Sequence, residues 1–281
     1  AGCAHLRLQV IVAVRVAGAR AMSWARVRAV DGCDARHPVI HAGDGPVRGI
    51  YLLPRAARRN SQAQNDDVRL LGRGDSGGPN PWEPYEHEEH DGIDSVAWVA
   101  EQSWCDGNVG MFGYSYVGFT QTLPAPLRSP YTKALVPIAS QQDNYGHIYV
   151  DGALHLHVAM AFHIWVGRGL QTESRNLMSE MELYRRLPLI SALDDIADVP
   201  WYRDIVRHNS YDDFWRRYGL RDKYQEVETP AYFITGWYDA LVHESFKQFN
   251  GWRSQARSAE ARRVTRLMVG PWLHGTIGSS E

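Results

Sequence analysis

Short apolar runs alternate with amphipathic stretches over the second half of the chain. The runs that predict buried strands are residues 109–112, 134–139, 231–237 and 264–270. A helix ending near residue 102 is predicted by apolar residues at helical spacing, namely Ile93, Val96, Ala97, Val99 and Ala100. Strands that alternate with helices in this way predict an α/β fold built on a mostly parallel sheet.

The predicted helix is preceded by the acidic run EHEEHD, residues 86–91. Negative charge suits the N-terminal end of a helix, and we expect this first turn to be exposed to solvent. His87 and His90 lie three residues apart, as two metal ligands on one helix can. No third ligand follows at a suitable spacing, so the solvated turn is preferred over a metal site.

Residues 145–226 differ in pattern from the segments on either side, because they show helical spacing, charged outer faces and no strand runs. We interpret them as a helical insert between two parts of the α/β core. His155, His157 and His163 fall in its first helical stretch, where hydrogen-bonded helix histidines are expected rather than metal ligands. Near the N-terminus, the apolar run 8–14 predicts a strand, and the hydrophobic part of a signal peptide is the alternative.

Gly113 and Gly118 bracket Ser115 directly after the apolar run 109–112. A strand, a sharp turn with a serine and a helix start together form a nucleophile elbow, which needs small neighbours because its backbone is strained and closely packed. The usual pattern is Gly-x-Ser-x-Gly, whereas here Val117 occupies the second glycine position. A serine in a glycine-rich turn without chemistry is the alternative. Pro124 ends the following helix within about two turns.

Three stretches of the chain resemble one family. The run DGNVGMFGYSYVGFTQ (106–121) is similar to the α/β-hydrolase family that groups cocaine esterase, X-prolyl dipeptidyl peptidases, α-amino-acid ester hydrolases and cephalosporin acylases. Its members carry Gly-x-Ser-Tyr-x-Gly, which Gly118 satisfies. TPAYFITGWYDALVHES (229–245) and RLMVGPWLHG (266–275) agree with the same family. The resemblance implies an α/β-hydrolase fold, a mostly parallel sheet with helices on both faces and an inserted helical cap.

The resemblance covers roughly residues 65–281 and divides the chain. The expected parts are a poorly matching N-terminal segment (1–43), the first part of the core (44–144), the helical cap (145–226) and the second part of the core (227–281). Residues 44–55 look like the first family strand, and residues 67–78 resemble a family loop. The β-rich C-terminal domain of the family is expected to be absent. The family segment that carries a tyrosine whose hydroxyl helps form the oxyanion hole is not found in this sequence. Tyr51 is not at the matching place and is not assigned this role.

Ser115, Asp239 and His274 follow the Ser, Asp, His chain order of α/β-hydrolases. Asp239 and His274 come just after two predicted strands, at the sheet edge where open α/β sheets bind ligands. A serine hydroxyl needs a base, which His274 provides, and the carboxylate of Asp239 holds the imidazole tautomer. Strand-end position and family motif both support these catalytic assignments. The backbone N–H of Tyr116 is the expected oxyanion donor.

Several aromatic residues are candidates for the substrate pocket. The primary candidates are Tyr114, Trp165, Trp237 and Tyr238, and further candidates in the insert are Trp201, Tyr202 and Trp215. Ordinary core packing is the alternative for each of them.

Composition and charge exclude several partners. The 281 residues are 44% hydrophobic with a net charge of −2, which argues against a nucleic-acid partner. Cys3, Cys33 and Cys105 are an odd, widely spaced set and indicate neither disulfides nor a cysteine zinc site. No run of about 18 apolar residues predicts a membrane span. We expect no cofactor, no metal and a cytoplasmic location.

The expected function is hydrolysis of an ester or amide through an acyl-enzyme on Ser115, acting on a small molecule or a short peptide. An esterase or acylase is favoured over an X-Pro dipeptidyl aminopeptidase, because a peptidase needs acids that hold the substrate α-amine and the sequence does not locate them. An impaired or inactive fragment of such a hydrolase is an alternative of another class. A third alternative, a metal-dependent enzyme using the insert histidines, is discounted because no ligand spacing supports it. The oligomeric state is not indicated.

Overall fold

The structure is a computed structural model, and it describes residues 85–101, 105–164, 180–196, 199–274 and 276–277. It also describes the backbone of two strands near the N-terminus, β1 (Ile11–Val16) and β2 (Ser23–Trp24). β1 overlaps the apolar run 8–14, so the strand predicted there is confirmed. The predicted family segments 44–55 and 67–78 and the pocket candidate Trp165 lie outside the described residues.

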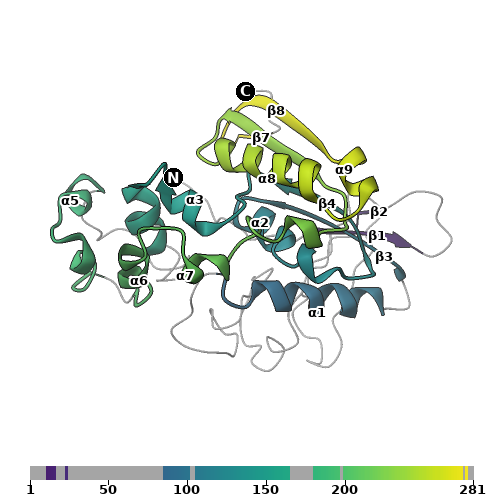
Figure 1. Cartoon of the computed structure of the whole chain (residues 1–281), viewed down its shortest axis with the longest axis horizontal. Coiled ribbons are helices and arrows are strands. Elements are labelled where there is room, and N and C mark those ends of the chain that lie inside the picture. The colour runs from purple at the N-terminus through teal and green to yellow at the C-terminus, as the bar shows by residue number, and fades with distance from the viewer. Residues whose placement is uncertain are drawn as a thin grey trace, which may run out of the picture.

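Six strands form one sheet in the order β2-β1-β3-β4-β7-β8 (Figure 1). The last four are β3 (Cys105–Tyr114), β4 (Thr132–Ile138), β7 (Tyr232–Tyr238) and β8 (Arg266–Leu273). These four strands run parallel to one another, whereas β1 pairs antiparallel with β3. Each of the four apolar runs overlaps one of the parallel strands, which confirms the mostly parallel sheet.

Helices precede or connect the parallel strands. They are α1 (Glu88–Ala100), α2 (Tyr116–Thr122), α8 (Val242–Gln255) and α9 (Ala259–Val264), with a 3-10 turn, η2 (Ala125–Leu127), after α2. α2 ends just before Pro124, as predicted, because a proline lacks the N–H that the helix ladder needs. α1 begins one turn earlier than the apolar periodicity indicated.

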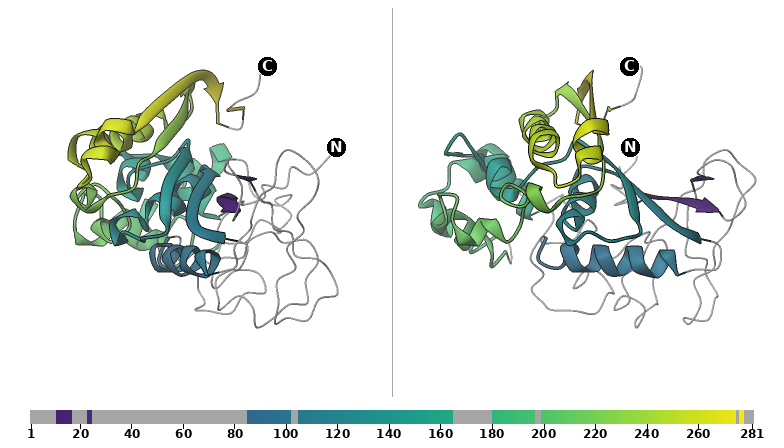
Figure 2. Two further views of the ribbon diagram at one scale, coloured as in Figure 1. Left: turned by 90° about the vertical axis from the view of Figure 1, so that its right-hand side faces the viewer. Right: turned by 45° about the vertical axis from the view of Figure 1, so that its right-hand side comes forward.

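Apolar side chains from α1, β3, β4, β7 and α8 meet in one buried cluster. Val99, Val109, Phe233 and Trp252 are each at most 1% exposed. Figures 1 and 2 show α1 lying along β3 and α8 lying against β7, so the two helices cover the sheet at different strands. The indole N–H of Trp252 donates to the carbonyl oxygen of Thr229 at 2.8 Å. This cluster fixes the strands whose ends carry the candidate site.

The described residues between β4 and β7 form short helices, turns and one small hairpin at the end of the sheet where β7 and β8 finish (Figure 1). The elements are α3 (Asn144–Ile148), η3 (His157–Phe162), α5 (Glu180–Tyr184), η5 (Leu189–Ser191), α6 (Tyr202–Arg207), α7 (Asp213–Arg216) and η6 (Tyr224–Glu226). Trp201, Tyr202 and Trp215 are buried in the apolar cluster of this insert. Core packing therefore accounts for these three pocket candidates.

One small hairpin interrupts the helical pattern of the insert. β5 (Tyr149–Val150) and β6 (Ala153–Leu154) pair through the two-residue loop Asp151-Gly152, and both loop residues have positive φ. Asp-Gly is the residue pair that favours such a turn. The expectation of an insert without strands is therefore wrong at this point. The Asp-Gly pair was the sequence feature that indicated a hairpin.

The first turn of α1 also differs from expectation. Glu88 is only 5% exposed, and its carboxylate accepts a hydrogen bond from the hydroxyl of Tyr116. The prediction of a solvated turn is therefore wrong for this residue, because a side chain distant in the sequence encloses it. None of the helices described here is long and apolar enough to cross a membrane.

Candidate active site

Ser115 joins β3 to α2 through a left-handed backbone turn with φ 59° and ψ −124°. A non-glycine residue in this region carries steric strain, which persists only where the surroundings hold it. The backbone N–H of Ser115 donates to the carbonyl oxygen of Ile138 at 2.8 Å, so the neighbouring strand β4 anchors the turn. This is the geometry of a nucleophile elbow.

Two glycines allow the close packing around this turn. A Cβ on Gly113 would lie 2.6 Å from the carbonyl oxygen of Val117, and a Cβ on Gly118 would lie 2.8 Å from that of Ile138. Real Cβ atoms do not approach backbone oxygens so closely, so both positions require glycine. Gly118, the displaced glycine of the motif, is thus the residue at which α2 meets β4.

The imidazole of His274 connects Ser115 with Asp239. His274 Nε2 lies 2.9 Å from Ser115 Oγ, and His274 Nδ1 lies 2.8 Å from Asp239 Oδ2. Asp239 follows β7 and His274 follows β8, whereas Ser115 follows β3. Three side chains far apart in the sequence therefore form one hydrogen-bonded chain at the carboxyl ends of parallel strands, where such sheets bind ligands.

The side chains of Asp239 and His274 differ in exposure. The Asp239 side chain is fully buried, and its second oxygen, Oδ1, accepts the backbone N–H of Leu241 at 2.7 Å. The His274 side chain is 39% exposed. A buried carboxylate with both oxygens hydrogen-bonded holds its partner imidazole in a fixed orientation. The exposed imidazole remains accessible to a substrate.

The remaining sequence-predicted residues occupy different positions. The rings of Tyr114 and His274 lie 4.8 Å apart, so Tyr114 borders the site. The side chain of Tyr116 is buried against Glu88 rather than lining a pocket. Trp237 and Tyr238 are 60% and 69% exposed, and the Trp237 ring lies 5.7 Å from that of Phe246 on α8. Their role as pocket residues stays a prediction, as does that of Trp165.

His147 on α3 is a site neighbour that sequence reasoning missed. Burial, together with the smaller effects of the neighbouring imidazoles of His155, His163, His243 and His274, lowers the pKa of His147 to about 3. With this pKa the His147 imidazole is neutral near pH 7, so it is a hydrogen-bonding group rather than a charge. The histidine follows β4 by fewer than ten residues, and this strand-end position was the available signal.

The insert histidines have individual partners. His163 Nδ1 lies 2.6 Å from the carbonyl oxygen of Val158, and His157 Nδ1 lies 3.0 Å from the hydroxyl of Tyr184. Within the described ranges, no group of three or more His, Cys, Asp or Glu side chains is arranged to hold a metal ion.

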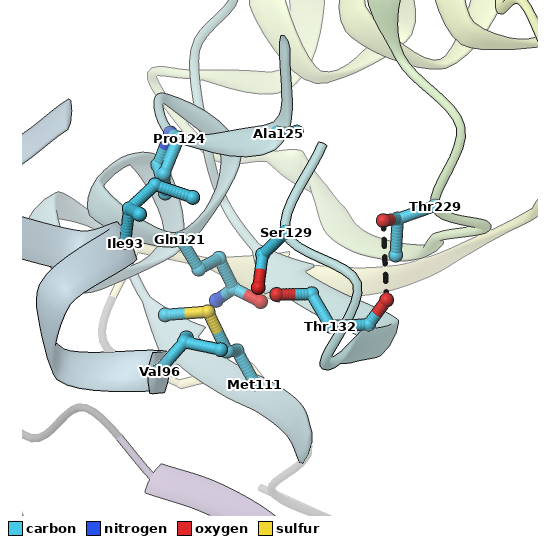
Figure 3. Close-up of a pocket in the computed structure, with 9 residues that line it drawn as sticks. All are labelled: Ile93, Val96, Met111, Gln121, Pro124, Ala125, Ser129, Thr132 and Thr229. Atoms are coloured by element: carbon cyan, nitrogen blue, oxygen red, sulfur yellow. Dashed lines mark hydrogen bonds between the residues drawn. The ribbon is translucent and has the colours of Figure 1, made fainter. Parts of the chain in front are cut away.

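A small cavity lies apart from the three hydrogen-bonded residues (Figure 3). It measures about 10 Å³ and is lined by Ile93, Val96, Met111, Gln121, Pro124, Ala125, Ser129, Thr132 and Thr229. The hydroxyl of Thr229 donates to the carbonyl oxygen of Thr132 at 3.4 Å across one side of it. Its volume matches roughly one water molecule, so it is a packing defect of the core rather than a substrate site.

Comparison with known proteins identifies relatives of this chain. Residues 67–276 match the family described as X-Pro dipeptidyl-peptidase (S15 family). The chain is 32% identical over 213 residues to a cocaine esterase from Rhodococcus sp. (strain MB1 Bresler), covering 69% of this chain and 36% of the esterase. An aminopeptidase structure from a marine sediment Thaumarchaeota archaeon has a TM-score of 0.56 at 19% identity, covering 71% of this chain and 33% of that one. An α-amino acid ester hydrolase structure has a TM-score of 0.50 at 20% identity, with the same two coverages.

The chain thus spans about a third of the length of these relatives. The similar structures confirm the α/β-hydrolase fold that the sequence motifs implied. The family match includes Ser115, Asp239 and His274, the three residues that the hydrogen bonds bring together. Since the match extends over most of its residues, the chain belongs to the X-Pro dipeptidyl-peptidase (S15) family.

Proposed function

We propose that this chain is a serine hydrolase that cleaves an ester or amide by transferring the acyl group first to Ser115 and then to water. The observation that carries the proposal is the continuous hydrogen-bonded chain from Ser115 through His274 to the buried Asp239. Such an arrangement of alcohol, imidazole and carboxylate activates a serine on many unrelated folds. Similarity to a cocaine esterase and to the peptidase family supports the same reaction class.

Ser115, His274 and Asp239 have distinct roles in the reaction. His274 Nε2 accepts the proton from Ser115 Oγ as the oxygen attacks the carbonyl carbon of the substrate. The tetrahedral intermediate collapses when His274 returns that proton to the leaving alcohol or amine, which leaves an acyl-enzyme. A water molecule then attacks the acyl carbon with His274 again as the base, and the acid is released. Asp239 keeps the Nδ1 proton on its side of the ring and stabilises the imidazolium.

The oxyanion of each tetrahedral intermediate needs hydrogen-bond donors. Tyr116 directly follows Ser115 at the start of α2, and in a nucleophile elbow the backbone N–H of the residue after the serine forms part of the oxyanion hole. We assign the backbone N–H of Tyr116 as one donor on this ground. A single such donor contributes a factor of about 10²–10³ to kcat.

We favour an ester as the substrate over an X-Pro peptide. The family match supports peptidase action as the second candidate, and recognition of a peptide N-terminus requires acids that face the bound α-amine. The buried acids Asp143 and Glu244 near α3 are already engaged, with Arg221 and Lys247 respectively. We further propose that residues 145–226 form the cap over this site, since the described elements of this segment lie at the same end of the sheet.

The test compares wild type with Ser115→Ala on p-nitrophenyl acetate and on an X-Pro p-nitroanilide. We expect ester hydrolysis by wild type, no detectable turnover by Ser115→Ala and full activity for Ser210→Ala, which alters an exposed serine. Activity that survives EDTA separates this mechanism from a metal-dependent one. Equal activity of Ser115→Ala and wild type would remove the serine from the mechanism, and an inactive wild type would favour a non-catalytic fragment.

A further inference from the structure

A buried polar contact lies directly beneath the nucleophile turn. Glu88 on α1 is 5% exposed and Tyr116 is 8% exposed, and the Tyr116 hydroxyl donates to Glu88 Oε1. Burial raises the pKa of Tyr116 well above its usual range, so the phenol remains a proton donor. Buried charge is stabilised only where it is hydrogen-bonded. The contact therefore links two segments that are 28 residues apart in the chain.

The surroundings of the Glu88 carboxylate favour its role as the acceptor of this hydrogen bond. Its other oxygen, Oε2, accepts the backbone N–H of His87 at 3.2 Å. Glu88 is the first residue of the 13-residue helix α1, whose positive end favours a negative group. Burial raises the pKa of Glu88, and the hydrogen bond from Tyr116 acts in the opposite direction by favouring the carboxylate.

The Tyr116 ring is held from a second side. It stacks on the Tyr85 ring with centroids 4.3 Å apart and an interplanar angle of 20°. Tyr85 itself is a buried non-glycine residue with φ 69°. A strained backbone of this kind is retained only where surrounding contacts fix it. The side chain of Tyr116 is thus fixed by one ring face and by its hydroxyl.

In the proposed mechanism, Tyr116 donates its backbone N–H to the oxyanion. It directly follows Ser115 and opens α2, a helix of seven residues. So short a helix has few hydrogen bonds of its own to fix the direction of its first N–H group. The direction of that N–H group therefore depends on two anchors, the hydrogen bond from Ser115 to β4 and whatever holds the Tyr116 side chain.

We propose that Glu88 is a positioning residue, which through the hydroxyl of Tyr116 holds the Tyr116 backbone N–H in line with the oxyanion of the tetrahedral intermediate. This role rests on the proposed hydrolase function. Glu88 touches neither substrate nor nucleophile in this scheme, and it acts only through Tyr116. Its effect is therefore on the transition state, where the oxyanion carries charge, rather than on substrate binding.

Tyr116→Phe removes the hydroxyl and leaves the ring in place. We expect kcat for p-nitrophenyl acetate to fall about tenfold with little change in KM, since misdirecting a donor costs part of the 10²–10³ that losing it costs. Affinity for a boronic acid that mimics the tetrahedral intermediate should fall by a similar factor. Glu88→Gln, which keeps an acceptor oxygen, should retain more of kcat than Glu88→Ala. The double variant Tyr116→Phe/Glu88→Gln should lose no more than the worse single variant, because both act on one contact.

Tyr149→Phe is the matched control. Tyr149 is 5% exposed in the same apolar cluster, and its hydroxyl donates to the carbonyl oxygen of Ile205 at 3.0 Å. Both tyrosine variants should lower the urea midpoint to a similar extent, but only Tyr116→Phe should lower kcat and boronate affinity. If Tyr116→Phe and Tyr149→Phe match in kcat and boronate affinity while wild type is active, Glu88 has only a structural role. If wild type itself shows no turnover, the proposed function fails and this role fails with it.

Discussion

The exchange of Asp239 for asparagine tests the role of the buried carboxylate in detail. Asp239 Oδ1 accepts the N–H of Leu241 at 2.7 Å, while Oδ2 faces His274 Nδ1 at 2.8 Å. In Asp239→Asn the amide oxygen stays on Leu241, because the backbone N–H requires an acceptor. The amide NH₂ then faces Nδ1, which has to accept a hydrogen bond. The proton moves to Nε2, and His274 loses the lone pair that should receive the Ser115 proton.

The expected loss is large because the wrong tautomer removes the base. Serine hydrolases with this change lose about 10⁴ in kcat, which corresponds to about 5.4 kcal/mol in the activation barrier. We expect the same order for initial rates of p-nitrophenyl acetate hydrolysis at saturating substrate. KM should change little, since the fully buried carboxylate does not contact the substrate.

The insert provides a closely matched control. Asp212 Oδ2 lies 2.6 Å from His208 Nδ1, and Asp212 Oδ1 accepts the backbone N–H of Phe214 at 3.1 Å. Asp212→Asn therefore makes the same chemical change in the same type of Asp–His pair, outside the site, at a helix start that tolerates asparagine. We expect it to keep wild-type kcat. An Asp239→Asn enzyme within tenfold of wild type would contradict the reasoning.

Two further predictions concern stability and pH. Trp252→Ala should lower the free energy of unfolding by about 3–5 kcal/mol in urea titrations, because it empties a fully buried indole site, whereas Trp237→Ala, at a 60% exposed side chain, should cost less than about 1 kcal/mol. Equal losses would mean that the core is misassigned. Burial and the charge of Glu244 raise the pKa of Asp143 from 3.8 to about 6. The folded state therefore binds this proton more tightly, and the Asp143 contribution to stability weakens as pH rises from 4 to 6, by up to about 3 kcal/mol. Asp143→Asn should lose this term, so its stability relative to wild type should increase over that interval; a difference that is constant with pH would contradict it.

Much of the site geometry follows from local sequence. Ser115 lies between close-packed glycines, and the requirement for Gly118 comes from the carbonyl oxygen of Ile138 on the next strand. Asp239 and His274 follow apolar runs that form parallel strands, and carboxyl ends of parallel strands lie on one edge. Strand-end position alone thus brings the three residues to the same edge before any side-chain contact is known.

Contacts between distant segments were not predictable in this way. Glu88 belongs to an acidic run typical of an exposed helix start, and only the fold shows Tyr116 enclosing it. His147 lies in a stretch without periodic signal, and the imidazoles that lower its pKa include His243 and His274, which are distant in the sequence. The sequence does not show whether Trp201 and Trp215 line a pocket or pack in the core, because both roles need large apolar rings. Burial decides between them.

The most direct test of the central claim is covalent labelling with a fluorophosphonate, measured by intact-protein mass and by peptide mapping. An activated serine attacks the phosphorus and expels fluoride, whereas unactivated serines do not react on the same timescale. We predict one adduct per chain, located on the peptide that contains Ser115 and absent from Ser115→Ala and His274→Ala. A chain that takes up no label, or carries it on another residue, would contradict the claim that His274 and Asp239 activate Ser115.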